Sequence, residues 1–414
     1  MNSRVVITGI GIVSALGNDR ETTWEALKQG QSGVGQLRDV PYIPEGLMPA
    51  ALVRGIEAGR WQQRTIPLAL TTAAEAIQDS YIDECPVDKS RFGCSVAANI
   101  GITPALMPPI SEFQSHDEMV PWFKQFLPCT IGTAVSQQHG LEGPLLCNST
   151  ACASGTVALL NAYRSIQCDQ CDVALAGASQ TIHPLLAAGF YNMRVLAQHA
   201  DPKQACRPFD VHRSGFVMGE GSAMFVLERL DHALARQAPI YAEIVGGHLA
   251  CDAHHVTSLD DDSAALNYLI RQTLGKARLQ PTDIAYINAH GTGTKQNDVM
   301  ETRGIREAFG PAANDLCLSS TKAVLGHMLN ASGAVELAVT ALTLRDGFAP
   351  PTINLTEPDP DCDLDCIPFV GRQRAFEHAL KLSIAFGGNL AAVALRRWSE
   401  AGERTAPLPM RRAA

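Results

Sequence analysis

Short apolar strands and helical stretches alternate along almost the whole chain, and this alternation constrains the fold more than any other feature of the sequence. Strand-like apolar runs, such as 4–10 and 284–288, occur in both halves. Several of the stretches between them, such as 68–80, place apolar residues at i, i+3 and i+4, which is the period of a helix with one buried face. The pattern predicts an α/β protein in which layers of helices cover sheets.

The alternation also predicts where the elements lie. We expect strands at 4–10, 93–98, 173–177, 222–227, 242–245, 284–288, 317–319 and, as a pair, 382–395. We expect helices at 22–30, 68–80, 152–167, 261–277, 298–309 and 331–346. Asp298 is a plausible N-cap, with Glu301 three residues later as in a capping box. A chain of 414 residues is long enough for two fused halves with separate cores, which we place at 1–240 and 241–414.

A cysteine at the start of one predicted helix is the first candidate for chemistry. Cys152 lies in the segment NSTACASGT (148–156), between a short apolar run and an apolar-periodic stretch. The first turn of a helix favours the thiolate, which is the nucleophilic form. The small neighbouring residues allow a sharp turn and leave room for an acyl group. A lone cysteine is nevertheless more often a buried structural thiol.

Two histidine segments favour the catalytic interpretation. His290 lies in NAHGTGT (288–294), after a strand-like run, and His327 ends SSTKAVLGH (319–327), which is followed by NASGAVE (330–336). Both histidines follow a strand in a loop rich in Gly, Ser and Thr, where the backbone can approach a ligand closely. One such histidine alone is more often structural. One cysteine and two histidines in three similar turns indicate nucleophilic catalysis.

In the segments around Cys152, His290 and His327, the chain resembles the β-ketoacyl-[acyl-carrier-protein] synthases of the elongating type. It is most similar to the ketosynthase II branch of the thiolase superfamily and to its type II polyketide or aryl-polyene relatives. Further motifs extend the resemblance over nearly the whole chain: VVITGIGIVS (5–14), RPFD (207–210), GFVMGEG (215–221), PPTINL (350–355) and FGGN (386–389). The resemblance implies a thiolase-like, five-layered αβαβα fold of two duplicated halves. No repeat between the halves is visible in the sequence.

The resemblance also implies a reaction and roles for residues. Cys152 would take an acyl chain from a carrier thioester, and the backbone N–H groups of Cys152 and Phe386 would form the oxyanion hole. His290 and His327 would stabilise the enolate formed when a malonyl thioester loses carbon dioxide. The product would be a β-ketoacyl chain extended by two carbons.

The remaining site residues carry supporting roles in the family. Lys322 would pair with Glu336 and hold its loop in place, although a solvated ion pair is the alternative. The other assignments are Asp298 and Glu301 as acidic supports, Thr292 and Thr294 against the phosphopantetheine arm, Ile100 and Phe190 in the acyl tunnel, Phe386 as its gate, and Arg194, Arg60 and Arg64 as carrier-protein contacts. Ordinary core packing is the alternative for Ile100 and Phe190.

The chain departs from the family pattern near its C-terminal end. The usual segment reads NSFGFGGTN, whereas residues 382–390 read LSIAFGGNL. Ala385 replaces a glycine of the gate, and a Gly-to-Ala change stiffens a loop. Ile384 replaces an aromatic residue. We therefore expect a specialised polyketide or polyene pathway, with or without a partner subunit, instead of the main fatty-acid elongation step.

Three other functions compete with this interpretation. A chain-length-factor-like partner subunit would typically lack the nucleophilic Cys152. A degradative thiolase would need a second catalytic cysteine near the C-terminal glycine-rich turn, where this chain has Phe386. An initiating synthase pairs its cysteine with His and Asn, whereas His327 occupies the second position here.

Composition restricts partners and location. The formal net charge of −9 and the absence of a long basic stripe argue against nucleic-acid binding. No apolar run reaches the roughly 20 residues that span a membrane, and a strand begins almost at the N-terminus, so we expect a cytoplasmic protein. Twelve irregularly spaced cysteines suit a reducing compartment. Cys168 and Cys171 form an isolated CxxC, which is weak support for a metal, and Gly9-x-Gly11 is weak support for a dinucleotide.

We therefore expect no metal and no cofactor beyond the phosphopantetheine that an acyl carrier protein brings. The expected partners are that carrier protein and a second ketosynthase-like subunit, in a homodimer or a heterodimer.

Overall fold

The structure is a computed structural model of the chain that describes residues 3–41, 43–59, 62–97, 125, 127–260 and 262–399. Its centre is a ten-stranded mixed sheet with the order β11-β10-β14-β15-β9-β1-β8-β6-β4-β5. The strands are β1 (Val5–Ser14), β4 (Phe92–Ala97), β5 (Leu145–Asn148), β6 (Val173–Gln180), β8 (Gly221–Arg229), β9 (Ala242–Cys251), β10 (Ile284–Asn288), β11 (Cys317–Ser319), β14 (His378–Ile384) and β15 (Asn389–Arg397).

The sheet consists of two halves with the same topology. From the centre outward, the first half runs β1-β8-β6-β4-β5 and the second runs β9-β15-β14-β10-β11, so each half places its first, last, fourth, second and third strand in that order. The strand directions also match, because the two outer pairs of each half are parallel and the two inner pairs are antiparallel. The halves join where β1 pairs with β9. The duplication implied by the family resemblance is thus present.

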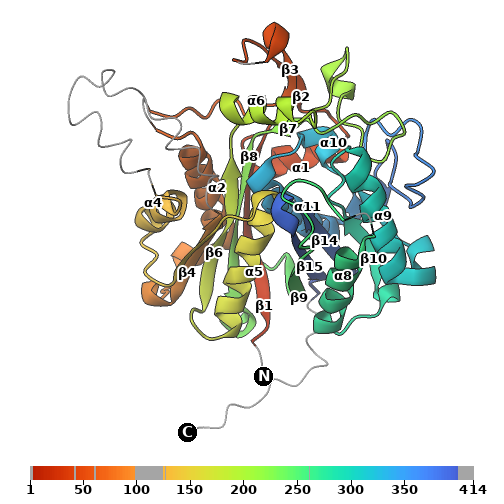
Figure 1. Cartoon of the computed structure of the whole chain (residues 1–414). Coiled ribbons are helices and arrows are strands. Elements are labelled where there is room, and N and C mark those ends of the chain that lie inside the picture. The colour runs from red at the N-terminus through yellow and green to blue at the C-terminus, as the bar shows by residue number, and fades with distance from the viewer. Residues whose placement is uncertain are drawn as a thin grey trace, which may run out of the picture.

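Helices form three layers around the two halves of the sheet (Figure 1). The central layer holds α5 (Ser154–Gln167) and α11 (Ser332–Asp346), which contact each other and strands of both halves. The outer layers are α2 (Thr65–Ser80) with α4 (Thr130–His139), and α8 (Ala264–Ala277) with α9 (Lys295–Phe309). Every residue of α11 from Ser332 to Leu344 is buried, which suits a helix covered on all sides. This is the expected five-layered α/β fold.

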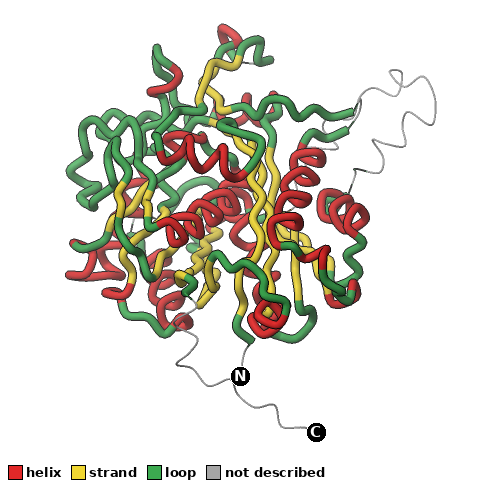
Figure 2. The backbone as a smooth tube through the Cα atoms, turned by 180° about the vertical axis from the view of Figure 1, so that it is seen from behind, coloured by secondary structure: helices red, strands yellow, loops and turns green. Residues whose placement is uncertain are grey.

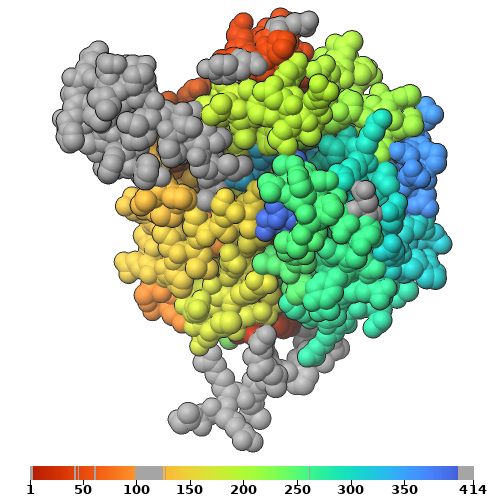
Figure 3. Space-filling view, in the orientation of Figure 1, coloured from red at the N-terminus to blue at the C-terminus, as the bar shows by residue number. Residues whose placement is uncertain are grey.

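Smaller elements cover the ends of the strands (Figure 2). A three-stranded sheet holds β2 (Val34–Leu37), β3 (Met48–Ala51) and β7 (Met218–Gly219), and a two-stranded ladder joins β12 (Phe348–Ala349) to β13 (Arg372–Gln373). The short helices are α1 (Arg20–Lys28), α6 (Pro184–Asn192), α7 (Leu230–Ala235) and α10 (Lys322–Leu325). In the space-filling view, a small blue patch from the C-terminal part of the chain shows between the yellow and green surfaces of the two halves (Figure 3).

Most predicted elements are present, but the helices predicted to begin at 22, 68, 261 and 298 begin at Arg20, Thr65, Ala264 and Lys295. The predicted pair at 382–395 is β14 and β15, separated by a 3₁₀ turn at Phe386–Gly388. Helix α9 begins at Lys295 and not at Asp298, so the predicted capping box does not exist. The Asp298 and Glu301 side chains bind backbone of other loops, as described below. The sequence did not predict β5, since it has only four residues and is partly exposed.

The two central helices approach each other unusually closely at their N-termini. A Cβ atom added at Gly155 would lie 2.6 Å from the Ala334 nitrogen, and one added at Gly333 would lie 2.3 Å from Thr156 Oγ1. Glycine at both positions therefore lets the start of α5 meet the start of α11. The segments that precede these two helices, one from each half, are brought together at the same place.

Candidate active site

Cys152 lies at the meeting point of the two central helices. The chain leaves β5, forms a 3₁₀ turn at Ala151–Ala153 and enters α5 at Ser154. Burial raises the pKa of the Cys152 thiol to about 12, although the backbone N–H groups of Cys152 and Phe386 both favour the thiolate. The start of the helix favours the thiolate as expected, but removal from water opposes it and is the larger effect on this thiol.

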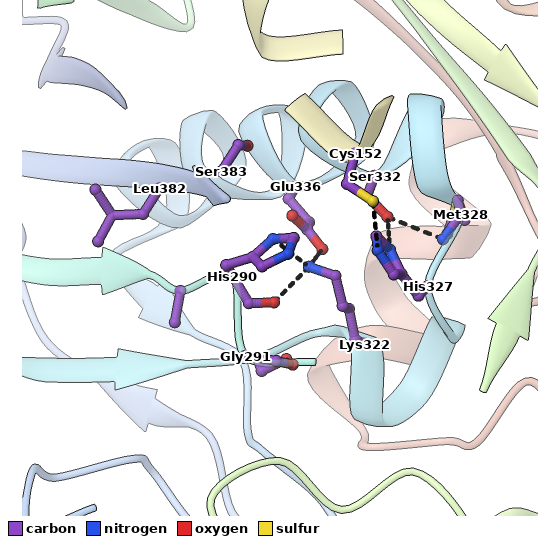
Figure 4. A network of polar contacts seen from close by, with 12 residues as sticks. Cys152, His290, Gly291, Lys322, His327, Met328, Ser332, Glu336, Leu382 and Ser383 are labelled. Carbon is purple, nitrogen blue, oxygen red and sulfur yellow. Dashed lines mark hydrogen bonds and ion pairs between the residues drawn. The ribbon is translucent and has the colours of Figure 1, made fainter. Parts of the chain in front are cut away.

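His327 contacts the sulfur directly (Figure 4). Its Nε2 lies 3.1 Å from Cys152 Sγ, and its Nδ1 lies 2.8 Å from Ser332 Oγ at the start of α11. Ser332 Oγ also accepts a 2.9 Å hydrogen bond from the Met328 N–H. The His327 backbone is fixed by a 2.6 Å hydrogen bond from its N–H to the Val217 carbonyl. The sequence placed Ser332 in a motif but gave it no role, because its contact with the ring is tertiary.

His290 faces His327 from the loop after β10. The two rings lie 5.5 Å apart and nearly perpendicular. Burial, followed by the charge of Lys322, lowers the pKa of each imidazole well below its usual range, so both rings are neutral. Lys322 Nζ lies 3.5 Å from His290 Nδ1. An ammonium group only donates, so this contact places the proton of the neutral His290 ring on Nε2.

Glu301 and Asp298 hold the loop that carries His290. The Glu301 carboxylate accepts hydrogen bonds from the N–H groups of His290 (2.6 Å) and Gly291 (2.7 Å). The Asp298 carboxylate accepts from Phe209 (2.8 Å) and Gly293 (3.2 Å). Burial raises the pKa of both carboxyl groups. These carboxylates support the site through loops from both halves of the chain.

Lys322 and Glu336 form a buried ion pair. Lys322 Nζ lies 2.5 Å from Glu336 Oε1 and donates to the His290 carbonyl at 2.5 Å. The Lys322 side chain is 0% exposed and that of Glu336 is 4% exposed, which excludes the alternative of a solvated pair. Sequence reasoning missed Lys381, whose Nζ lies 2.9 Å from the other oxygen, Glu336 Oε2. A single lysine in an apolar strand gives no local signal of this contact.

Cys152, His290 and His327 open into one cavity of about 350 Å³. Its lining includes Cys152, His290, His327, Thr292, Thr294, Phe190, Phe386, Ile384 and Ala385. The Thr292 and Thr294 hydroxyls lie 2.9 Å apart. Two of the residues that depart from the family pattern thus border the reaction space.

Aromatic rings shape the wall beside the nucleophile. The Phe190 ring lies 5.3 Å from Phe216 and 6.4 Å from Phe386. Phe216 also packs edge-on against His327 at 5.3 Å, a contact that sequence reasoning did not identify. The turn that carries Phe386 is fixed by a 2.7 Å hydrogen bond from the Gly387 N–H to the Val256 carbonyl.

Basic residues lie at the mouth of the cavity. Arg194 is exposed and borders the cavity as well as an adjoining surface hollow, and Lys295, the exposed first residue of α9, borders it too. Arg64 differs from the expectation, because its guanidinium binds Glu220 at 2.6 Å and the Ile56 and Val53 carbonyls inside the protein. Arg60 and Ile100 lie outside the described residues.

Within the described ranges, no cluster of three or more His, Cys, Asp or Glu side chains is placed to hold a metal ion. Cys168 is exposed at the end of α5, whereas Cys171 is buried. Among the helices of the described residues, none is both long and apolar enough to cross a membrane.

Comparison with known proteins agrees with this geometry. A family model described as the β-ketoacyl synthase N-terminal domain matches residues 2–233, and one described as the C-terminal domain matches residues 241–356. The chain is 37% identical to a putative polyketide β-ketoacyl synthase 1 of Streptomyces cyaneus, over 95% of this chain and 98% of that protein. It is 34% identical to a 3-oxoacyl-[acyl-carrier-protein] synthase 2 of Synechocystis sp., over the same shares of both chains, 95% and 98%.

Solved structures give the same result. One is a type II polyketide synthase ketosynthase in complex with its acyl-carrier protein and bound to a hexaketide, with a TM-score of 0.87, 30% identity and coverage of 96% of this chain and 100% of that chain. Another is the ishigamide ketosynthase/chain length factor, with a TM-score of 0.85, 29% identity and the same coverage, 96% and 100%. The fold and site define an acyltransferase of the thiolase-fold class. The chain belongs to the β-ketoacyl synthase family.

Proposed function

We propose that the chain catalyses the decarboxylative Claisen condensation of an acyl thioester on Cys152 with malonyl-acyl-carrier protein. The observation that carries the proposal is the contact of Cys152 Sγ with His327 Nε2 at 3.1 Å, in a cavity that His290 shares. This arrangement provides a nucleophile and two neutral imidazoles at one point. A chain-length-factor-like subunit without its own catalysis is disfavoured by that same contact.

The first step is transfer of the acyl chain to the enzyme. Cys152 Sγ attacks the carbonyl carbon of an acyl-carrier thioester, and the phosphopantetheine thiolate leaves with the proton that the Cys152 thiol gave up. The N–H groups of Cys152 and Phe386, which already interact with the sulfur, are placed to hold the oxyanion. Each such donor stabilises a transition state by about 3 kcal/mol.

The second step forms the new carbon–carbon bond. Malonyl-carrier protein loses carbon dioxide, and the enolate oxygen accepts hydrogen bonds from the Nε2–H groups of His290 and His327. For His290, the Lys322 contact on Nδ1 supports this tautomer. The enolate carbon attacks the acyl-Cys152 carbonyl, the carbon–sulfur bond breaks, and the Cys152 thiolate takes up a proton from solvent water. The product is the β-ketoacyl-carrier protein with two more carbons.

The carrier protein is proposed to dock at the mouth of the cavity. Arg194 and Lys295 offer exposed positive charge there, which suits an acidic carrier, and the Thr292 and Thr294 hydroxyls are available to the phosphopantetheine arm. That arm arrives with the carrier, so the reaction as proposed uses no other cofactor. We also propose a cytoplasmic location and a dimer, formed with a second copy or with a ketosynthase-like partner.

For the pathway, we propose a specialised polyketide or polyene system. Ile384 and Ala385 support this choice, because the two positions that depart from the elongation pattern line the cavity. The division of the chain at residues 240 and 241 is also proposed, and the repeated strand order of the two halves supports it.

The test of substrate class is intact-protein mass after mixing the chain with acyl-carrier proteins that bear saturated or conjugated chains of several lengths. We expect adducts on the wild-type chain that are absent from Cys152→Ala, with preference for unsaturated chains. Acylation by saturated chains alone would return the protein to fatty-acid elongation. No adduct with any folded sample, alone or with a partner subunit, would contradict the proposed condensation.

A further inference from the structure

Lys381 is a buried lysine that the reaction above does not use. It lies on β14 opposite Asn288 of β10 and is 0% exposed. Its Nζ lies 2.9 Å from Glu336 Oε2, contacts the Leu382 carbonyl, and lies 3.5 Å from the carbonyl of Ala289, the residue before His290. Lys381 thus joins α11, β14 and the end of the strand that carries His290.

Two ammonium groups share one carboxylate at this place. Glu336 Oε1 binds Lys322 and Glu336 Oε2 binds Lys381, so the three side chains together carry one net positive charge. Burying such an excess charge costs free energy unless neighbouring groups pair with it or change their own charge. The groups that face the cluster are His290, His327, the Cys152 thiol and the Glu301 carboxylate, and Glu301 is already held by the His290 and Gly291 N–H groups.

Lys322 alone does not provide this excess charge. It lies 2.5 Å from Glu336 Oε1, so the pair of side chains is neutral as a unit, although the charge of Lys322 still lowers the pKa of both imidazoles. Lys381 adds a second cation without adding a second anion. Lys381 therefore adds to the positive field that Lys322 already places on the two imidazoles.

We propose that Lys381 is a positioning residue whose charge keeps His290 and His327 neutral, and whose contacts fix the end of the strand that carries His290. This inference rests on the proposed condensation, in which both rings must offer an N–H to the enolate. The same positive charge stabilises the negative enolate as it forms. Lys381 acts through the histidines and does not itself border the cavity.

The electrostatic trends agree with this geometry. After burial and Lys322, the charge of Lys381 further lowers the pKa of both His290 and His327. Burial lowers the pKa of Lys381 itself to about 8, so the ammonium form is present at neutral pH. Removing the cation raises the pKa of both imidazoles. As the pH is lowered, the rate of decarboxylation then begins to fall at a higher pH than in the wild-type protein.

The experiment compares the pH dependence of carbon dioxide release from malonyl-carrier protein in wild type, Lys381→Met and Lys381→Met/Glu336→Gln. Lys381→Met leaves the cluster neutral. We expect the acidic limb of the pH–rate profile to move to a higher pH by roughly one pH unit. The double variant again carries one net positive charge, so its limb moves back toward wild type even if its rate stays low. Lys89→Met, which removes a partly exposed lysine near Asp83, is the charge control and leaves the limb in place.

An unchanged acid limb in folded Lys381→Met, with active wild type, would overturn the role of Lys381 alone. Absence of carbon dioxide release from wild type would instead overturn the proposed function. If thermal unfolding shows that Lys381→Met does not fold, histidine NMR titrations of wild type and Lys381→Gln are compared, with His290→Asn and His327→Asn for assignment. A higher pKa of both histidines in Lys381→Gln than in wild type supports the proposal, and equal pKa values contradict it.

Discussion

The turns before the two central helices have the same architecture and opposite chemistry. In the first half the chain passes through a 3₁₀ turn at Ala151–Ala153 into α5, and in the second through a 3₁₀ turn at Leu329–Ala331 into α11. Residues 151–155 read ACASG and residues 329–333 read LNASG, a local repeat that the sequence comparison of the halves overlooked. Both turns start at a residue with positive φ, 46° at Ala151 and 43° at Leu329.

A serine at the equivalent position closes each turn. Ser154 Oγ accepts from the Thr150 N–H at 2.9 Å, and Ser332 Oγ accepts from the Met328 N–H at 2.9 Å. Only Ser332 also contacts a catalytic ring, His327. The first half thus contributes the nucleophile, and the second contributes the histidines and the buried cations. The duplicated turn is therefore a scaffold, and a few side chains decide its chemistry.

We expect the largest effect from a variant that abolishes the activity assigned to the first half and keeps the activity assigned to the second. Cys152→Ala removes the only nucleophile of the proposed mechanism, so acyl transfer to the protein is lost, whereas decarboxylation of malonyl-carrier protein survives because both histidines remain. Intact mass and carbon dioxide release measure the two activities. Loss of both in a folded variant would contradict this division of labour.

Changing the second half should give the opposite result. His290→Ala or His327→Ala removes one donor to the enolate, and we expect decarboxylation to fall by roughly 10²–10³-fold. Acylation of Cys152 should fall much less, especially in the His290 variant, whose ring does not contact the sulfur. Normal carbon dioxide release from the double variant would exclude these roles.

The two serines provide a matched pair. Ser154→Ala and Ser332→Ala each remove a similar turn-closing hydrogen bond, and each should lower the free energy of unfolding by about 1 kcal/mol. Only Ser332→Ala should also reduce decarboxylation, by about tenfold, because His327 loses the partner of Nδ1. Urea unfolding together with the carbon dioxide assay tests this, and equal activity losses in both variants would remove the special role of Ser332.

The remaining prediction concerns the contact that joins the halves. Gly333→Ala forces a Cβ to within 2.3 Å of Thr156 Oγ1 and 2.8 Å of the Thr156 nitrogen, and should destabilise the protein by roughly 1–3 kcal/mol. Gly275→Ala in α8 is the control, since nothing lies within 4 Å of its added Cβ. Gly275→Ala should be neutral or slightly stabilising in the same unfolding measurement. Equal stability of the two variants would show that the helices separate easily.

Local patterns predicted the parts of the site that lie in local motifs. Cys152, His290 and His327 each follow a strand in a loop of small residues, so the sequence identified them. The spacing of Asp298 and Glu301 suggested a capping box, but their partners are backbone groups that only the tertiary fold brings near.

The rest of the site depends on packing between distant segments. The burial of Lys381 depends on Glu336 from another element, which no pattern within β14 reveals. The helix start at Cys152 is visible in the sequence, whereas the burial that raises the pKa of its thiol is not. Element positions were predictable where apolar periodicity was long, and β5 was missed because it is short and partly exposed.

The most direct test of the central account is a single-turnover reaction of pre-acylated Cys152 with malonyl-carrier protein labelled in its free carboxylate. We expect loss of the acyl-enzyme, release of labelled carbon dioxide and formation of the β-ketoacyl-carrier protein to occur together in equal amounts. Loss of the acyl-enzyme without carbon dioxide, or carbon dioxide without the extended chain, would contradict it.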